Sequence, residues 1–385
     1  MTDGKKVCAI VCEYNPFHNG HKYHIEQTRK LGYDYIVCAM SGSMVQRGDV
    51  AIYDKWFRAK TAVSNGADLV IEIPTYYVLR SAQKYAFGAI KTISSLGFVD
   101  ALSFGSECGS IETLTSVSDI IRTEPERYKN ALHDALDKGL SYPAACENAL
   151  SAAMGENTFE QNPNDVLAIN YISELKKINS DIEPISICRK GNYHDIVPTS
   201  AEFASATAVR SLIKSSEDVS PYVPNKSCEK YFLENMESLI IGSLRLRKPT
   251  ELDGVIGMEP GLANRLISAA EKSSDINEFF ANCTTKRYTL HRIRRTVLCS
   301  LLGINHGGVL DYIRVLAFNV KGKNLLSAAK KKSLLNIVTK TADFSPCANS
   351  VFKYDIAATD ISALCCSDIT KRKSGKDFTT SPQIV

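Results

Sequence analysis

Two histidines stand three residues apart in the segment His18-Asn19-Gly20-His21. The segment follows a short apolar run, residues 7–12, and opens an amphipathic stretch, residues 20–31, so we expect a strand, a turn and a helix. The start of a helix offers phosphate unpaired backbone N–H groups and the positive end of the helix dipole. Two imidazoles at this point can both reach one phosphate and stabilise the charge that develops when its phosphorus becomes five-coordinate. The spacing therefore predicts a nucleotide-binding turn with His18 and His21 as catalytic residues.

Other residues of the turn fit the same chemistry. Gly20 has no Cβ, so a nucleotide can approach the backbone closely there. Asn15 could bind phosphate oxygens or orient the loop, and Pro16 stiffens it. The competing use of two histidines is metal binding, but no third ligand stands nearby, which disfavours a zinc site. We expect no structural metal bound by the protein.

The elements that must position this turn alternate between strands and helices. Apolar runs at 7–12, 35–40, 68–73, 101–105 and 185–188 predict buried strands, and stretches such as 55–65 and 81–96 predict helices between them. Strands separated by helices form a parallel sheet with right-handed crossovers. In such a sheet ligands bind outside the carboxyl ends of the strands. We therefore expect an α/β fold with the turn at its ligand-binding edge.

The second half of the chain has a different pattern. The polar stretch 215–226, with Pro221 and Pro224, predicts a domain boundary. Helical periodicity then dominates, with expected helices over 229–243, 262–272, 276–281, 289–302 and 307–316. We expect a first domain over 1–218, a mainly helical, basic domain over 225–385, and a loose polar tail from 371 onward.

Composition narrows the class of protein. The 385 residues carry a net charge of +4, too small by itself to indicate a nucleic-acid partner. The twelve cysteines include no C-x-x-C pair, which disfavours a zinc ribbon or a thioredoxin-like site. No apolar run approaches the ~20 residues of a membrane span. We expect a cytoplasmic protein without a membrane partner, and the role of Cys365 and Cys366 stays open.

Several stretches together resemble the bacterial tRNA(Met) cytidine acetate ligase family, within the H-x-G-H nucleotidylyltransferase superfamily. They lie at 13–21, 40–42, 46–48, 54–59, 65–74, 285–289 and 292–295, so the resemblance extends from residue 7 to about residue 320. It implies a Rossmann-like ATP-binding core. It also implies ATP-dependent activation of acetate to acetyl-adenylate and transfer of the acetyl group to N4 of the wobble cytidine of elongator tRNA(Met). Mg²⁺ would accompany ATP, and the oligomeric state, the carboxylate selectivity and the choice of tRNA stay open.

The resemblance also implies an ATP site that extends beyond the turn. Gly105 ends the fourth strand, where it could instead be a plain turn glycine, and Asn164 opens a helix, where it could also be the N-cap. Arg189 follows the fifth strand, and its guanidinium suits phosphate, although a solvated surface arginine is the alternative. The expected ATP-binding residues are Val11, Cys12, Glu13, Tyr14, Asn15, Pro16, Phe17, His18, Asn19, Gly20, His21, Lys22, Tyr23, His24, Gly105, Asn164, Arg189, Ser205, Thr207 and Arg210.

The last three of these residues resemble the second signature of the superfamily, a Ser/Thr-rich helix start that ends in arginine. The hydroxyls and N–H groups could hold the β- and γ-phosphates, with Arg210 neutralising them, whereas an ordinary helix cap is the alternative. The loop 41–49 also follows a strand. Its Gln46 and Arg47 could bind acetate or the tRNA, unless the loop is a mobile surface segment.

Basic residues gather in the second half of the chain, where the resemblance implies tRNA binding. Arg292 and Arg295 share one face of a predicted helix, and such stripes bind phosphates with release of counterions. Tyr288 could stack on an anticodon base, although a basic stripe is more often a solvated surface. The candidate tRNA-binding residues are Lys286, Arg287, Tyr288, Arg292 and Arg295.

Two other functions use the same features. An adenylyltransferase acting on a small phosphorylated metabolite would explain the first domain but leave the basic helical domain without a role. A non-catalytic ATP-sensing or RNA-binding module would need a degenerate site, and both histidines are intact here. A ligase of this kind would exchange pyrophosphate into ATP only when acetate is present. An exchange assay with and without acetate therefore distinguishes it from both alternatives.

Overall fold

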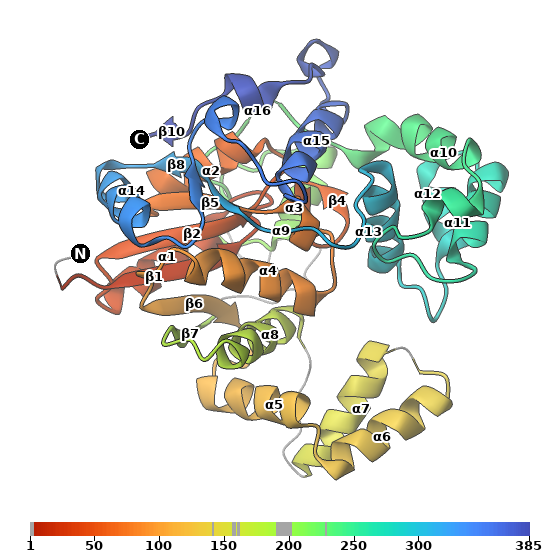
Figure 1. Cartoon of the computed structure of the whole chain (residues 1–385), viewed down its shortest axis with the longest axis horizontal. Coiled ribbons are helices and arrows are strands. Elements are labelled where there is room, and N and C mark those ends of the chain that lie inside the picture. The colour runs from red at the N-terminus through yellow and green to blue at the C-terminus, as the bar shows by residue number, and fades with distance from the viewer. Residues whose placement is uncertain (1–3, 141, 156–158, 160–161, 190–201, 228) are drawn as a thin grey trace.

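The computed structural model describes residues 4–140, 142–155, 159, 162–189, 202–227 and 229–385. An eight-stranded sheet lies at its centre in the order β10-β8-β5-β2-β1-β6-β7, and β9 also pairs with β8 (Figure 1). β5, β2, β1, β6 and β7 run parallel, whereas β8 runs antiparallel to β5. The strands of this sheet are β1 (Val7–Cys12), β2 (Tyr35–Ser41), β5 (Leu69–Ile73), β6 (Ala101–Ser106), β7 (Glu183–Cys188), β8 (Tyr312–Phe318), β9 (Asn336–Val338) and β10 (Gln383–Ile384).

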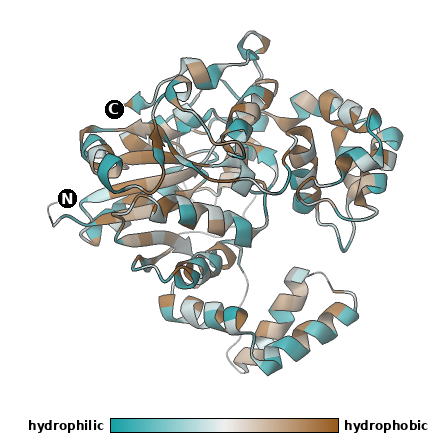
Figure 2. Cartoon of the chain, in the orientation of Figure 1, coloured by the Kyte–Doolittle hydropathy of each residue, from teal (hydrophilic) through white to brown (hydrophobic). Residues whose placement is uncertain are grey.

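Helices cover both faces of the sheet because its central strands are apolar on both sides. On β2, Val37 belongs to the apolar cluster that includes side chains of α4, α8 and α14, whereas Ile36 and Cys38 belong to the cluster that includes side chains of α1 and α2. Neighbouring side chains of a strand point to opposite faces, so one continuous apolar run serves two cores. Figure 2 shows the apolar strands between helices whose outer surfaces are polar. The helices of this part are α1 (Asn19–Lys30), α2 (Lys55–Ser64), α3 (Thr75–Val78), α4 (Ala82–Ser94), α8 (Pro163–Lys177), α9 (Ala206–Lys214) and α14 (Val320–Lys332).

Two helical groups and a hairpin extend from this core. The pair α6 and α7 lies below the sheet in Figure 1, next to α5, and α10 to α13 form a separate group at the right. A two-stranded hairpin, β3 (Met44–Val45) and β4 (Asp49–Val50), follows β2. The other elements are α5 (Ile111–Thr123), α6 (Glu126–Asp137), α7 (Tyr142–Met154), η1 (Leu233–Met236), α10 (Glu237–Arg245), η2 (Pro249–Leu252), α11 (Leu262–Lys272), α12 (Ile276–Cys283), α13 (Leu290–Leu301), η3 (Thr341–Asp343), α15 (Phe352–Ala363), η4 (Ile369–Lys371) and α16 (Lys376–Thr379).

The α/β class is confirmed, but two predictions for the second half are wrong. The second half of the predicted helix over 307–316 belongs to strand β8, which pairs with β5. Its apolar run is too short for periodicity to separate a strand from a helix segment. The helix expected from 229 begins only at Leu233, with a 3₁₀ turn. Because β8, β9 and β10 join the central sheet, that sheet takes strands from both sides of the expected boundary near residue 220.

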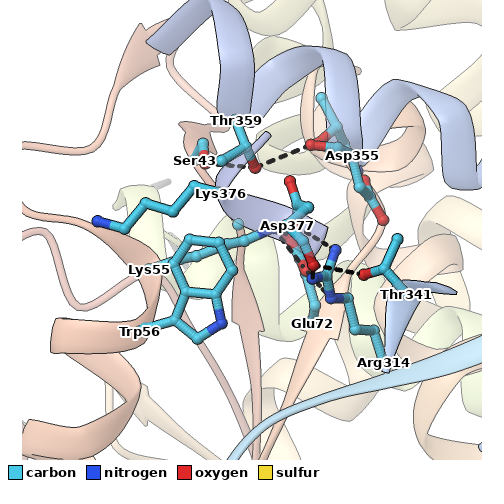
Figure 3. A network of polar contacts seen from close by, with 12 residues as sticks. Ser43, Lys55, Trp56, Glu72, Arg314, Thr341, Asp355, Thr359, Lys376 and Asp377 are labelled. Atoms are coloured by element: carbon cyan, nitrogen blue, oxygen red, sulfur yellow. Dashed lines mark hydrogen bonds and ion pairs between the residues drawn. The ribbon is translucent and has the colours of Figure 1, made fainter. Parts of the chain in front are cut away.

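The predicted loose tail is also wrong, because buried charges anchor it (Figure 3). Asp377, on α16, is 1% exposed and forms ion pairs with Lys55 and Arg314, and Lys55 also pairs with Glu72 at 2.9 Å. The side chains of these four residues are 0–5% exposed. Removing one member of such a network leaves an uncompensated buried charge. These pairs therefore fix the tail to α2, β5 and β8, and nothing in the tail's own pattern marks them.

Within the described residues, no helix combines the length and apolarity that crossing a membrane requires.

Candidate active site

The two histidines begin α1 as a reciprocal cap. His18 is the N-cap residue; its Nδ1 accepts the N–H of Gly20 at 3.1 Å, and its own backbone N–H donates to Nδ1 of His21 at 3.2 Å. The rings stack with their centroids 3.7 Å apart. A Cβ on Gly20 would lie 2.9 Å from the His18 ring, so a glycine here allows the histidine ring to take this position.

These hydrogen bonds determine what the rings can donate. Because both Nδ1 atoms accept an N–H, the proton of each neutral ring lies on Nε2. Burial, with the charges of Arg189 and Arg210, lowers the pKa of His18 to about 3. Burial and the neighbouring His18 hold the pKa of His21 well below its ordinary value. At neutral pH the site therefore presents two stacked, neutral imidazoles, each with one Nε2–H donor.

Two arginines from distant segments provide positive charge around the histidines. Arg189 follows the last residue of β7, and its backbone N–H donates to the carbonyl of Ser106. Arg210, on α9, donates to the carbonyl of Asn15 at 2.7 Å and to Thr207 Oγ1 at 3.1 Å. Its helix begins at the N-cap Ser205, whose hydroxyl accepts the N–H of Ala208. The start of α9 is thus joined directly to the turn before His18.

A third group surrounds the carboxyl ends of β6 and β7. Asn164 donates through its side-chain amide to Glu107, and a Cβ on Gly105 would lie 3.3 Å from Arg189 Cγ. The alternative of Asn164 as the N-cap is wrong, because Asn162 holds that position in α8. These predicted residues therefore lie around the carboxyl ends of two neighbouring strands. Arg189 lies close to Gly105, and its charge also lowers the pKa values of His18 and His21.

Several predicted turn residues have structural partners. Tyr14 packs its ring against Phe17 and His21, with centroids 4.8 and 4.9 Å away. The Asn15 side chain accepts the N–H of Ile52, so of its two possible roles the contact favours loop orientation. Asn19 donates to the carbonyls of 202 and 221, which ties the start of α1 to the segments on either side of α9.

The remaining predicted ATP residues lie at the edges of this group. His24 Nε2 is 2.8 Å from the hydroxyl of Ser103, so that nitrogen is engaged with β6. Val11 is partly buried and Cys12 is buried near the end of β1, whereas Lys22 is exposed on α1. Tyr23 contacts the ring of Phe203. The buried Pro16 belongs to the turn itself.

The predicted substrate loop is a hairpin against the turn. The backbone N–H of Gln46 donates to Glu13 Oε1 at 2.6 Å, and its side chain donates to the carbonyl of Arg80. Arg47 is partly buried, and its positive charge acts to lower the pKa of both Glu13 and His291. Burial raises the pKa of the Glu13 carboxyl despite its arginine neighbours.

Sequence reasoning missed two buried residues that hold the site together. Arg58 is fully buried and donates to the carbonyls of Glu13, Ser41 and Gly42, which joins the ends of β1 and β2. Asp165 is also fully buried and accepts from Ser106 Oγ and from the backbone N–H groups of 107 and 108. The sequence marks neither residue, because α2 also carries Lys55 and Lys60, and Asp165 stands in the first turn of α8, where an acid is common.

The predicted tRNA-binding residues divide into two sets. Lys286 and Arg287 are exposed, and Arg287 and Arg292 both form ion pairs with Glu259. Tyr288 is partly buried, with the guanidiniums of Arg287 and Arg292 at 5.4 and 5.0 Å from its ring centre. Arg295 donates to the carbonyl of Gln46 and lies with the hairpin instead.

The structure also bears on metal binding. Among the described residues, no three His, Cys, Asp or Glu side chains come together in a way that could hold a metal ion. Glu13 accepts from the N–H of Gln46 through Oε1, and Glu107 accepts from Asn164 through Oε1.

Comparison with known proteins gives consistent results over the whole chain. The family model described as HIGH Nucleotidyl Transferase matches residues 5–377. The tRNA(Met) cytidine acetate ligase of Acetivibrio thermocellus is 36% identical over 97% of this chain and 98% of its own length. The protein of that name from Caldanaerobacter subterraneus subsp. tengcongensis is 40% identical over 92% and 94%. The crystal structure of Thermotoga maritima TmcAL bound with alpha-thio ATP aligns with a TM-score of 0.89 at 31% identity and covers 99% of both chains.

Proposed function

We propose a function from the family to which this chain belongs, that of the tRNA(Met) cytidine acetate ligases among the HIGH nucleotidyl transferases. In the first step, an oxygen of acetate attacks the α-phosphorus of ATP, the bond to the bridging oxygen breaks, and pyrophosphate leaves. In the second step, N4 of the wobble cytidine of elongator tRNA(Met) attacks the acetyl carbon. The anhydride bond breaks, AMP leaves, and the nitrogen gives up one proton. We place the reaction in the cytoplasm, where tRNA is found.

The observation that carries the proposal is the pair of neutral, stacked imidazoles at the start of α1. Their Nε2–H groups donate without adding charge, and the dipole of α1 adds a positive potential. The backbone N–H groups of Asn19, Gly20 and His21, expected to be unpaired, instead donate within the chain. A five-coordinate α-phosphorus carries more negative charge on its oxygens than ATP in the ground state. Donors fixed before the reaction stabilise that charge without reorganising. We therefore assign the contact with the α-phosphate to His18 and His21.

The remaining phosphates would lie between the two arginines. Arg210 and the start of α9, with Ser205 and Thr207, would hold the β- and γ-phosphates and favour pyrophosphate as the leaving group. Arg189 would neutralise charge from the side of β7. Gly105 and Asn164, near Arg189, would receive the nucleoside. Mg²⁺ would enter with ATP, bound to its phosphates.

The tRNA would bind on the helical group α10 to α13. Lys286 and Arg287 are exposed at the entry to α13. The ion pairs of Arg287 and Arg292 with Glu259 are partly exposed and thus weak, so phosphates can displace them. Tyr288, with two guanidiniums near its ring, suits a base that has left its stack.

Exchange of labelled pyrophosphate into ATP tests the first step. We expect exchange only in the presence of acetate and without any need for tRNA. Exchange that ignores acetate but responds to a phosphorylated metabolite would show instead the adenylyltransferase reaction considered above. A chain that binds ATP but shows no exchange with either would be a binding module.

A further inference from the structure

The β3–β4 hairpin is bonded to the segment that leads into the catalytic turn. The backbone N–H of Gln46 donates to Glu13 Oε1 at 2.6 Å. Just beyond the hairpin, the N–H of Ile52 donates to Asn15 Oδ1 at 2.8 Å. Glu13 and Asn15 lie five and three residues before His18, and the carbonyl of Asn15 also accepts from Arg210. A displacement of the hairpin would therefore move the turn that carries both histidines.

The other side of the same hairpin rests on α13. Arg295 donates from Nη1 to the carbonyl of Gln46 at 3.2 Å. The same residue, Gln46, thus accepts from α13 at its carbonyl and donates to Glu13 at its N–H. Arg295, Gln46 and Glu13 form a continuous connection between the helical group and the turn.

Three further contacts hold the tip of the hairpin against α13. Arg294 pairs with Asp49 at 3.0 Å, and His291 Nδ1 lies 3.3 Å from the carbonyl of Arg47. Gly48 has φ +75°, and a Cβ there would lie 2.5 Å from the backbone nitrogen of Arg295. The close approach thus requires a glycine on the hairpin and places it flat against the helix.

The surroundings of Arg295 do not suit an RNA ligand. Its side chain is partly buried, and burial lowers its pKa to about 10. Lys286 and Arg287, by contrast, are exposed at the entry to the same helix. Arginines that bind phosphate backbones need solvent access to exchange counterions for phosphates.

We propose that Arg295 is a positioning residue for acetate activation: through the backbone of Gln46 it holds Glu13 and the catalytic turn in place before any tRNA binds. The proposal rests on the proposed function and assigns Arg295 a role other than the tRNA binding expected from the sequence. It also gives the helical group a part in the first step of the reaction. A misplacement of about 1 Å at a reacting group can lower a rate by about a hundredfold, so the loss of one backbone contact can slow acetate activation.

The test compares Arg295→Ala and Arg295→Lys with a matched arginine. Arg265, on α11, also donates to a backbone carbonyl within the helical group, that of Asn282, and among the described residues no hydrogen bond or ion pair joins it to the hairpin. We expect Arg295→Ala to lower kcat/KM of tRNA-free, acetate-dependent exchange by about tenfold or more. Arg295→Lys, which keeps a donor, should recover part of it, and Arg265→Ala should match the wild type. The tRNA Kd of Arg295→Ala should change less than twofold.

Gly48→Ala provides a second perturbation, from the hairpin side, if Arg295→Ala fails to fold. It should give the same loss of exchange, and the double variant should lose less than the product of the two single losses, since both act on one contact. Unchanged exchange with weaker tRNA binding would overturn the proposal and make Arg295 an RNA ligand. If the wild type shows no exchange, the proposed function fails, and ATP affinity decides instead: weaker binding by Arg295→Ala supports the positioning role, and equal binding overturns it.

Discussion

The pairing of Nδ1 with a backbone N–H in each histidine allows the structural and catalytic roles of His21 to be separated. In His21→Asn, the side-chain oxygen can accept the N–H of His18 as Nδ1 does now, at 3.2 Å, but nothing replaces the Nε2–H. In His21→Gln, the longer amide can place an N–H near the former Nε2. The first variant thus keeps the cap and loses the donor, and the second keeps a donor.

The expected magnitudes follow from these contacts. Loss of one preorganised donor to a developing oxyanion lowers a rate by about 10²–10³-fold, or about 3–4 kcal/mol. Loss of the cap contact costs about 1 kcal/mol of stability, as His21→Ala should show. His21→Asn should therefore reduce exchange by at least about a hundredfold at nearly unchanged stability. His21→Gln should retain more activity than His21→Asn.

The assay is acetate-dependent exchange of pyrophosphate at saturating ATP, with urea unfolding of each variant measured in parallel. Glu26→Gln, an exposed change on the same helix, serves as control and should match the wild type in both measurements. The reasoning is refuted if His21→Asn retains wild-type exchange, or if its loss of activity is matched by an equal loss in His21→Gln together with a lower unfolding midpoint. The latter result would make His21 a structural residue.

Further predictions concern stability and RNA binding. Asp377→Asn should lower the free energy of unfolding by about 3–5 kcal/mol, because it removes the buried carboxylate that pairs with both Lys55 and Arg314. Asp368→Asn, at an exposed carboxyl before η4, should have little effect in the same urea titration. The folded pKa values of the three turn histidines lie below the unfolded value of about 6.5, so stability is highest above that pH and falls as pH drops toward about 4, by about 1.4 kcal/mol per pH unit for each histidine. From pH 6 to pH 5 the unfolding free energy of the wild type should fall by about that slope relative to that of His21→Asn, which has no imidazole at this position, and a difference that does not change with pH would contradict the buried, neutral state of His21. Lys286→Ala with Arg287→Ala should weaken tRNA binding and reduce its salt dependence by about two phosphate contacts without slowing tRNA-free exchange, and an unchanged slope would remove these residues from the RNA surface.

The sequence predicts the first half of the fold because its signals there are local. The buried strands 7–12 and 35–40 are continuous apolar runs, and the H-N-G-H spacing places two histidines at one helix start regardless of what packs around it. The positions of the turn, of the carboxyl ends of the strands and of the helix starts follow from the same alternation of strands and helices. These are the features that periodicity and capping preferences report.

The parts that sequence reasoning missed depend on contacts between distant residues. Arg58 looks like an ordinary helix charge until its hydrogen bonds to the carbonyls of Glu13, Ser41 and Gly42, around the ends of β1 and β2, are known. Asp377 is one acid in a polar tail until Lys55 and Arg314 meet it inside the core. β8 becomes a strand because β5 offers a free edge, which its own seven residues do not reveal. Arg295 is one of several basic residues until its carbonyl partner on the hairpin separates it from the others.

Transfer of the acetyl group to tRNA tests the central claim most directly. Labelled acetate, ATP and elongator tRNA(Met) are incubated with the protein, and the tRNA is digested to nucleosides and analysed by mass spectrometry. The account predicts N4-acetylcytidine at the wobble position, formed only with ATP and acetate together and reduced by at least about a hundredfold in His21→Asn. Unmodified tRNA with wild-type protein, or adenylyl transfer to a phosphorylated metabolite without acetate, would contradict it.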